Sequence, residues 1–198
     1  SGAGRTAQMI ALSEAGAIGG GEGVDYDFRP DITLEDGGVL DHEEQELIAI
    51  WTPGHFGNHM AFSWNGALFT GDHVMAWAST MISPPGGDLG AFRRSCTQLQ
   101  LRSERLYLPG HGDGIEDGPT RLNWLLVHRF ERESQIISHL RGQPNTAPGL
   151  AEAIYTDIDP RLIYAATRNV LAHLIDLCER NLVTCQGPID LKAKYSVI

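Results

Sequence analysis

The sequence predicts an α+β protein, with short strands in the first part of the chain and helices in most of the rest. Three observations support this class. Short apolar runs bounded by Gly, Pro and Asn occur before residue 112, as is typical of buried strands. From Pro119 onward the apolar residues recur with a helical period. Finally, Gly187-Pro188 divides residues 182–198 into a two-stranded ribbon.

The predicted strands are defined by the turns that end them. Residues 47–51 (LIAIW) are almost continuously apolar and are stopped by Pro53-Gly54, which suits a buried strand. Asn65-Gly66 tolerates positive φ at both positions and therefore predicts a tight type I′ hairpin. Asp36-Gly37-Gly38 predicts a reversal between two short strands. The strands expected after it are residues 47–51, 59–64, 67–70 and 106–108.

Helices follow from apolar spacing and from Gly and Pro at their ends. The predicted helices are residues 5–16, 90–103, 119–142, 150–155 and 160–180. The Pro-, Gly- and Ser-rich residues 73–90 are predicted to form a long functional loop, and residues 143–149 are predicted to form a linker or turn. The buried face of the last helix is expected to hold Leu162, Ala166, Val170, His173 or Leu174, and Leu177. The last part of the chain thus has a helix, a short helix, a longer helix and a two-stranded ribbon, which is the order of a winged helix. We therefore predict two domains, residues 1–120 and 121–198.

Charge differs between these two parts. The 198 residues have a net charge of −10; residues 1–120 hold 17 acids against six Arg, and residues 121–198 hold eight acids against nine Lys and Arg. Neither part has the basic footprint of a nucleic-acid-binding protein, so nucleic acid is not the favoured partner. An apolar fraction of 42% is enough for a core and excludes wholesale disorder.

Compartment and membrane contact are also constrained by the sequence. No run of about 18 apolar residues occurs, so no membrane partner is expected. Cys96, Cys178 and Cys185 show neither zinc-finger nor thioredoxin spacing, and three cysteines cannot pair completely. A reduced, cytoplasmic location is the simpler prediction.

Three polar residues each follow a predicted strand and a glycine. They are His55 in Thr52-Pro53-Gly54-His55, Asp72 in Gly71-Asp72 and His111 in Pro109-Gly110-His111. Strand ends hold side chains in fixed directions, and imidazoles with a carboxylate suit zinc or a similar metal. Any one of these sequences alone favours an ordinary turn, because Pro-Gly and Gly-Asp are common in loops. The ordered set of three instead predicts a metal site.

The order TPGH, GD, PGHG resembles the second half of the metallo-β-lactamase fold superfamily, over most of residues 47–112. The resemblance implies an αββα sandwich with metals at one edge, followed here by a small winged-helix-like domain. It implies His55 and His111 as metal ligands and Asp72 as the bridging, catalytic carboxylate. One or two zinc ions are the expected cofactor, with iron or manganese as alternatives. Two features look most like a branch related to a beta-lactamase-like endoribonuclease. They are the loop with Trp77, Ser79 and Thr80, and the winged-helix-like tail, residues 121–198. Hydroxyacylglutathione hydrolases are a more distant relative.

One departure from this pattern matters. The superfamily's HxHxDH signature is absent, and the only earlier histidine, His42, lacks its spacing. Either the chain is the C-terminal portion of a longer protein, with the N-terminal part of the sandwich missing, or it is a relative without metal. Retention of His55, Asp72 and His111 favours the first explanation. We therefore expect a hydrolase at full length, and weak metal binding with no competent activity from these 198 residues.

The implied chemistry is hydrolysis, since a dinuclear site polarises a carbonyl or phosphoryl oxygen and lowers the pKa of a bound water to about 7. Small ester or thioester substrates are favoured over RNA because the catalytic part is acidic, and a metal-dependent ribonuclease is the alternative. A second alternative is a non-catalytic nucleic-acid-binding or regulatory module that uses Arg161, Arg168 and Arg180. A packing or homodimerisation role for the tail is preferred to that module.

Four further residues have weaker functional predictions. His59, four residues after His55, is a candidate for a hydrogen-bonding role next to the site. Trp77, Ser79 and Thr80 could form a substrate wall, or equally anchor the loop by packing.

Overall fold

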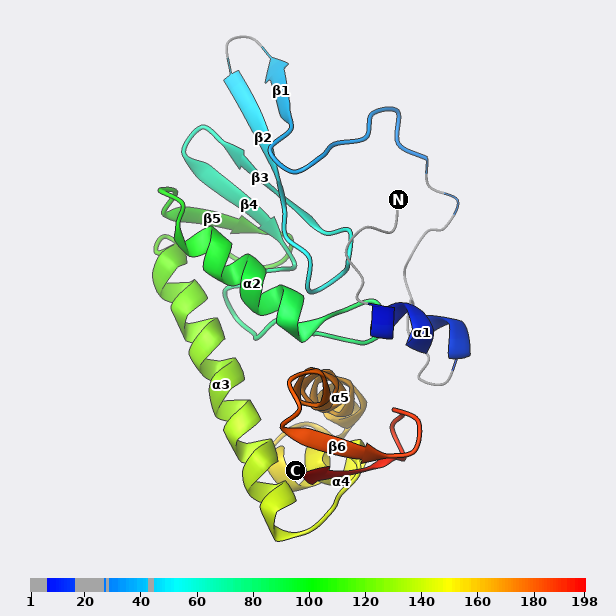
Figure 1. The fold of residues 1–198 in the computed structure, drawn as a ribbon. Coiled ribbons are helices and arrows are strands. Elements are labelled where there is room, and N and C mark those ends of the chain that lie inside the picture. The colour runs from blue at the N-terminus through cyan, green and yellow to red at the C-terminus, as the bar shows by residue number, and fades with distance from the viewer. Residues whose placement is uncertain (1–6, 17–26, 28, 43–44) are drawn as a thin grey trace.

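The computed structural model describes residues 7–16, 27, 29–42 and 45–198. Its main sheet has five strands in the order β1-β2-β3-β4-β5, and a separate ribbon pairs β6 with β7 (Figure 1). All pairs are antiparallel except β4 with β5. The strands are β1 (Val39–His42), β2 (Gln45–Trp51), β3 (Met60–Trp64), β4 (Ala67–Gly71), β5 (Leu106–Pro109), β6 (Val183–Gln186) and β7 (Lys194–Val197).

Helices cover one side of the sheet and build the tail below it (Figure 1). They are α1 (Ala7–Ala15), α2 (Leu89–Gln100), α3 (Gly118–Gly142), α4 (Ala147–Ile154), the 3₁₀ turn η1 (Pro160–Leu162) and α5 (Ile163–Glu179). None of the helices in the described part of the chain is both long and apolar enough to cross a membrane.

The sheet is apolar on both faces. On the helix side, Leu68 and Tyr107 are fully buried with Phe92 of α2 and Leu122 of α3. On the opposite side, the strand register from β2 to β5 aligns Ala49, Phe62, Phe69 and Leu108 in one row. Phe62, Phe69 and Leu108 are only half-buried. A sheet with two apolar faces is suited to a layered architecture in which each face is covered by another element.

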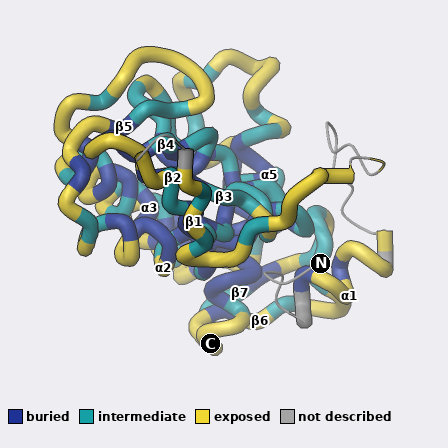
Figure 2. Tube along the Cα trace, turned by 90° about the horizontal axis from the view of Figure 1, so that it is seen from above, coloured by how far each residue is buried: buried dark blue, intermediate teal, exposed yellow. Residues whose placement is uncertain are grey.

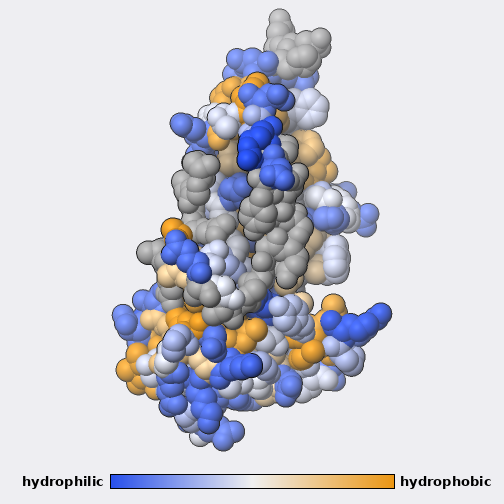
Figure 3. Space-filling view, turned by 90° about the vertical axis from the view of Figure 1, so that its right-hand side faces the viewer, coloured by the Kyte–Doolittle hydropathy of each residue, from blue (hydrophilic) through white to orange (hydrophobic). Residues whose placement is uncertain are grey.

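A second core lies in the tail, where α3, α4, α5 and the ribbon meet. Leu150 of α4, Leu174 of α5 and Tyr195 of β7 are fully buried there, and Met9 and Leu12 of α1 join them. Buried stretches along α2, α3 and α5 appear dark blue in Figure 2. Seen from the side that carries α1, apolar side chains gather over this lower part of the molecule, among hydrophilic ones (Figure 3). The predicted boundary at residue 120 stays a prediction.

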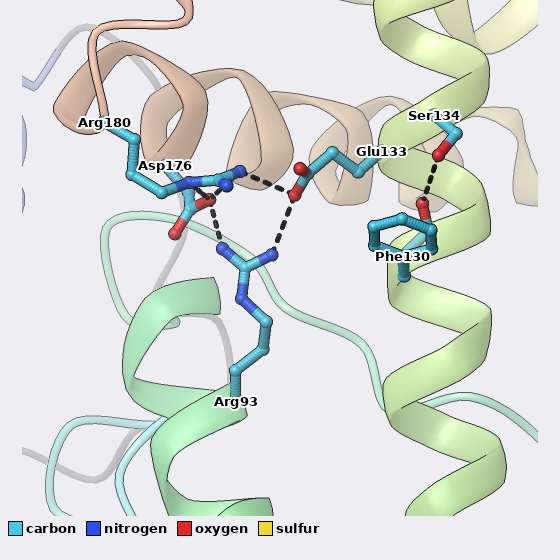
Figure 4. Close-up of polar contacts among 6 residues, drawn as sticks. All are labelled: Arg93, Phe130, Glu133, Ser134, Asp176 and Arg180. Atoms are coloured by element: carbon cyan, nitrogen blue, oxygen red, sulfur yellow. Dashed lines mark hydrogen bonds and ion pairs between the residues drawn. The ribbon is translucent and has the colours of Figure 1, made fainter.

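Helices α2, α3 and α5 are joined by a cluster of two arginines and two acids (Figure 4). Arg93 donates to Glu133 at 2.9 Å and also bonds Asp176. Arg180 donates to Asp176 at 2.8 Å and to Glu133 at 2.6 Å. Each charge therefore contacts two of opposite sign, and the cluster is neutral.

Most predicted elements are confirmed within a few residues. Asn65 and Gly66 both have positive φ, 48° and 77°, as the predicted hairpin requires. The predicted linker 143–149 is wrong at its end, because α4 already begins at Ala147 with Thr146 as its cap. The cap forms when Thr146 Oγ1 accepts from the Gly149 amide at 3.2 Å.

Two other predictions need correction. The turn at Asp36-Gly37 exists and the short strand predicted after it is β1, but residues 29–35 form no strand before it. Leu162, expected on the buried face of the last helix, is 56% exposed. Its position is explained by η1, because the regular helical period of α5 begins only at Ile163.

Candidate metal centre

The ends of β4 and β5 bring two of the predicted ligands together. These strands are parallel and in register at Gly71 and Pro109, so both chains leave the sheet at the same edge. Gly71 has φ +51°, a conformation that glycine adopts without strain. Asp72 and His111 follow directly, and His111 Nδ1 lies 2.6 Å from Asp72 Oδ1.

His55 completes a group of three around the same carboxylate. Its Nε2 lies 4.0 Å from Asp72 Oδ2, whereas His111 faces Oδ1. Each oxygen of Asp72 therefore faces a different imidazole. The structure thus brings together the three residues predicted as metal ligands, from three separate strand ends.

The tautomer of His55 follows from its hydrogen bond. Nδ1 lies 2.7 Å from the carbonyl oxygen of Met81. A carbonyl only accepts, so Nδ1 carries a hydrogen, and Nε2 is the nitrogen that the ring presents toward Asp72. A histidine that donates one nitrogen to a carbonyl and presents the other is arranged as metal-binding histidines are.

The loop that carries His55 is held tightly against α2. A Cβ at Gly54, whose φ is +149°, would lie 2.4 Å from the Cα of Phe92, so only glycine fits this approach. Ser95 of α2 also donates its hydroxyl to the carbonyl of Pro53 at 2.7 Å. His55 is therefore positioned by a rigid helix as well as by a strand.

Two imidazoles and one carboxylate have the chemistry of a zinc site. Zinc nevertheless takes three or four ligands per ion. Across residues 7–16, 27, 29–42 and 45–198, no group of three or more His, Cys, Asp or Glu is arranged to hold a metal ion. The three residues supply fitting donors but not a complete shell.

His59 lies directly behind this edge. Its Nδ1 is hydrogen-bonded to Thr52 Oγ1 at 2.8 Å, and a Cβ at Gly71 would lie 2.7 Å from its Nε2. Burial, reinforced by the neighbouring His55 and opposed by Asp72, lowers the pKa of His59 to about 4. The position is compatible with the predicted supporting role, which stays a prediction.

The loop after Asp72 contains both an exposed and a buried part. Trp77 is 73% exposed, and a Cβ at Gly112 would lie 2.9 Å from its Cδ1, so the indole lies on the backbone next to His111. Ser79 is half-buried. Thr80 does not fit a substrate wall, because it is fully buried and its hydroxyl donates to the His73 carbonyl at 2.7 Å.

Sequence reasoning missed the side chains that hold this loop. Arg121 of α3 donates to the carbonyls of Met75 and Ala78, both at 2.7 Å, and its guanidinium lies 4.2 Å from the Trp124 ring. No local signal could reveal these contacts, since the partners lie 43 and 46 residues apart in the chain.

The three arginines required by the nucleic-acid alternative do not form a phosphate-binding face. Arg161 pairs with Asp159 at 2.5 Å, and Arg180 belongs to the ionic cluster of Figure 4. Arg168 is buried, with its Nε 3.0 Å from the Ser83 hydroxyl. The distribution that would have supported that alternative is absent for these three residues.

The fold and the site define a protein of the metallo-β-lactamase fold with a C-terminal winged helix, as the sequence predicted. A domain described as "Beta-lactamase associated winged helix domain" matches residues 146–188. A metallo-beta-lactamase family protein from Thermus thermophilus matches 86% of this chain and 55% of its own, with 27% identity and a TM-score of 0.74. A beta-lactamase domain protein from Burkholderia ambifaria has the same fold, at 22% identity over 88% of this chain and 54% of its own, with a TM-score of 0.76.

The proteins that are similar to this chain in sequence include lactamase-like proteins. Lactamase-like protein adaB of Aspergillus niger is 28% identical over 87% of this chain and 59% of its own length. The Beta-lactamase-like protein 2 homolog of Drosophila melanogaster is 30% identical over 68% of this chain and 46% of its own. An atrochrysone carboxyl ACP thioesterase of Aspergillus chevalieri is 35% identical over 59% of this chain and 38% of its own length. The chain thus spans about 59% of the length of the first of these relatives.

Proposed function

We propose that this chain is the part of a metal-dependent hydrolase that supplies His55, Asp72 and His111 to a zinc centre, dinuclear in the complete protein. The observation that carries the proposal is the arrangement around Asp72, whose oxygens face His111 at 2.6 Å and His55 at 4.0 Å. These three residues would be the ones that hold the metal, with Asp72 as the carboxylate and His55 and His111 as the imidazoles. The remaining ligands are proposed to come from outside the described residues, because these three are too few for two ions.

The bound metal would supply Lewis-acid polarisation of the substrate oxygen. The chain's own residues do the rest. Asp72 provides the negative charge that attracts a cation to the strand edge, and His55 is kept with Nε2 toward it by the Met81 carbonyl. His111, with a side chain 70% exposed, lies on the solvent side, where substrate arrives. No Ser or Cys nucleophile is needed for such hydrolysis.

We propose a small ester or thioester as substrate. Trp77 lies against Gly112 next to His111 and offers an exposed aromatic surface for an acyl or pantetheine chain. The acidic character of residues 1–120 disfavours RNA. That a homologue is named an ACP thioesterase supports the same choice. A reduced, cytoplasmic setting is supported by the free thiols of Cys96, Cys178 and Cys185. Homodimerisation through the tail remains part of the proposal.

The test is turnover by the full-length protein on a panel of acyl thioesters, aryl esters and RNA, with and without chelator. His55→Ala, Asp72→Ala and His111→Ala should each reduce thioester turnover by at least about a hundredfold, since each removes a ligand. His139→Ala, on the exposed side of α3, is the matched control and should keep wild-type turnover. Unchanged turnover in the three variants would overturn the metal assignment, and metal-dependent cleavage of RNA alone would replace the substrate.

A further inference from the structure

We infer that Asn169 of α5 and Arg129 of α3 are positioning residues for His55, acting through the backbone of residues 80–82. Both residues belong to the C-terminal part of the chain, residues 121–198. We call the hydrogen bonds that they make to residues 80–82 the clamp. The inference rests on the proposed function, because it assigns these residues to the orientation of a proposed metal ligand. It names no new ligand of the metal, and neither residue touches substrate.

The clamp acts on both sides of Met81. Asn169 Oδ1 accepts from the amide of Ile82 at 3.0 Å. Arg129 donates through Nη2 to the carbonyl of Thr80, and through Nη1 to Asn169 Oδ1 at 3.2 Å. The peptide groups before and after Met81 are thereby fixed, and the direction of the Met81 carbonyl is fixed with them.

The burial of Arg129 indicates that these contacts are specific. It is 1% exposed, and no carboxylate lies within ion-pair distance of it among the described residues. Burial lowers its pKa to about 10, so it remains a cation at neutral pH. A buried cation without a counter-ion is costly unless its N–H groups are matched by oxygens. Here Nη1 and Nη2 are matched by the oxygens of Asn169 and Thr80, which are the two ends of the clamp, whereas Nε has no hydrogen-bond partner among the described residues.

The carbonyl so fixed is the one that orients His55. His55 Nδ1 donates to Met81 O at 2.7 Å, and this bond holds Nε2 on the side of Asp72. Loss of such an outer contact to a ligating histidine typically weakens metal binding by about 10–100-fold. Asn169 acts one step further away, so we expect the lower end of that range.

The experiment uses the 198-residue chain, with and without added zinc. Amide hydrogen exchange reports the Ile82 N–H, ¹⁵N NMR of the imidazole reports the tautomer of His55, and a zinc titration reports affinity. Asn169→Ala removes the acceptor, whereas Asn169→Asp keeps an oxygen for both donors. Arg180→Gln is the matched control, because it loosens the same helix junction without touching residues 80–82.

Asn169→Ala should raise Ile82 exchange at least about tenfold, increase the Nε2–H tautomer of His55, and weaken zinc binding about tenfold. Asn169→Asp and Arg180→Gln should retain the wild-type values of all three. The inference is overturned if Asn169→Ala leaves the His55 tautomer unchanged, or if Arg180→Gln changes it equally. If the NMR results hold but the full-length protein hydrolyses no ester, the proposed function fails and the clamp does not.

Discussion

Gly110 donates its amide hydrogen to the carbonyl of Gly71 at 3.0 Å, one residue before each of two proposed metal ligands. This bond joins the last residue of β4 to the residue that follows β5, and so ends the parallel pairing of the two strands. It sets the separation of the two chains at the point where Asp72 and His111 begin. Because glycine has no side chain, the carboxylate of Asp72 can lie over Gly110 without a clash.

Substitution of Gly110 by alanine should therefore displace the carboxylate. A Cβ at this position would lie 2.8 Å from Asp72 Oδ1, and the flexible carboxylate would move rather than the backbone. We expect at least about a tenfold loss of zinc affinity by calorimetry, with a change in unfolding free energy below about 1 kcal/mol. Gly142→Ala is the control, since a Cβ there meets nothing within 4 Å. Equal zinc affinity in both variants would contradict the placement of Asp72.

The Trp77 wall should affect substrate binding more than chemistry. Trp77→Ala removes the aromatic surface next to Gly112. Arg121→Ala removes the hydrogen bonds to the carbonyls of Met75 and Ala78, which fix the loop on both sides of Trp77. Both variants should raise KM for an aryl or long-chain thioester about tenfold, with kcat within about threefold of wild type. Asn123→Ala, exposed on the same helix, should leave both parameters unchanged. A fall in kcat at constant KM would assign Trp77 a different role.

Stability should depend strongly on the ionic cluster between α2, α3 and α5. Glu133→Ala leaves Arg93 and Arg180 with only Asp176 between them, and the Glu133 side chain is only 10% exposed. Removal of one partner from such a buried pair typically costs about 3 kcal/mol or more. Denaturant unfolding should show this loss, whereas Glu131→Ala on the exposed side of α3 should change stability by less than about 0.5 kcal/mol. Similar losses in the two variants would argue against the cluster.

Acid sensitivity should involve His173. It is fully buried, and neither ring nitrogen has a hydrogen-bond partner among the described residues. Burial lowers the pKa of His173 well below 6.5, and Arg129 and Arg93 lower it further. Below pH 6.5 the unfolded chain therefore binds a proton that the folded chain does not, so stability falls as the pH falls.

The variant His173→Leu should remove up to about 1.4 kcal/mol per pH unit of this dependence below about pH 6.5. At about pH 7.5 its stability should equal or exceed that of the wild type, because no hydrogen bond is lost. Urea unfolding at several pH values measures both quantities. His139→Gln, exposed on α3, serves for comparison. An unchanged slope in His173→Leu would show that other groups cause the acid sensitivity.

The features that the sequence predicted well are those with local causes. Asn65-Gly66 determines its hairpin, and the apolar period from Pro119 determines α3. The meeting of His55, Asp72 and His111 was also predictable, because each follows a strand of one sheet. The order of these three motifs along the chain was enough to indicate the fold.

The features that were missed depend on distant packing. For Thr80 the sequence left a substrate wall and a packed loop anchor equally open, because the bond that Arg129 donates to its carbonyl comes from 49 residues further along the chain. The role of Asn169 has the same origin, since its partner Ile82 is 87 residues away. β1 was expected only as a short strand after the turn at Asp36-Gly37-Gly38, without bounds, because its four residues, VLDH, have neither apolar continuity nor clear alternation.

The length of α3 has a consequence for how the chain loses its structure. Its 25 residues extend over about 37 Å, with Leu122 and Leu125 in the core under the sheet and Ile136 and Leu140 in the core of the tail. Melting of either end would remove side chains from a core and shorten the helix that the other core requires. Calorimetry should therefore record one transition, with equal calorimetric and van't Hoff enthalpies, although the chain has two cores.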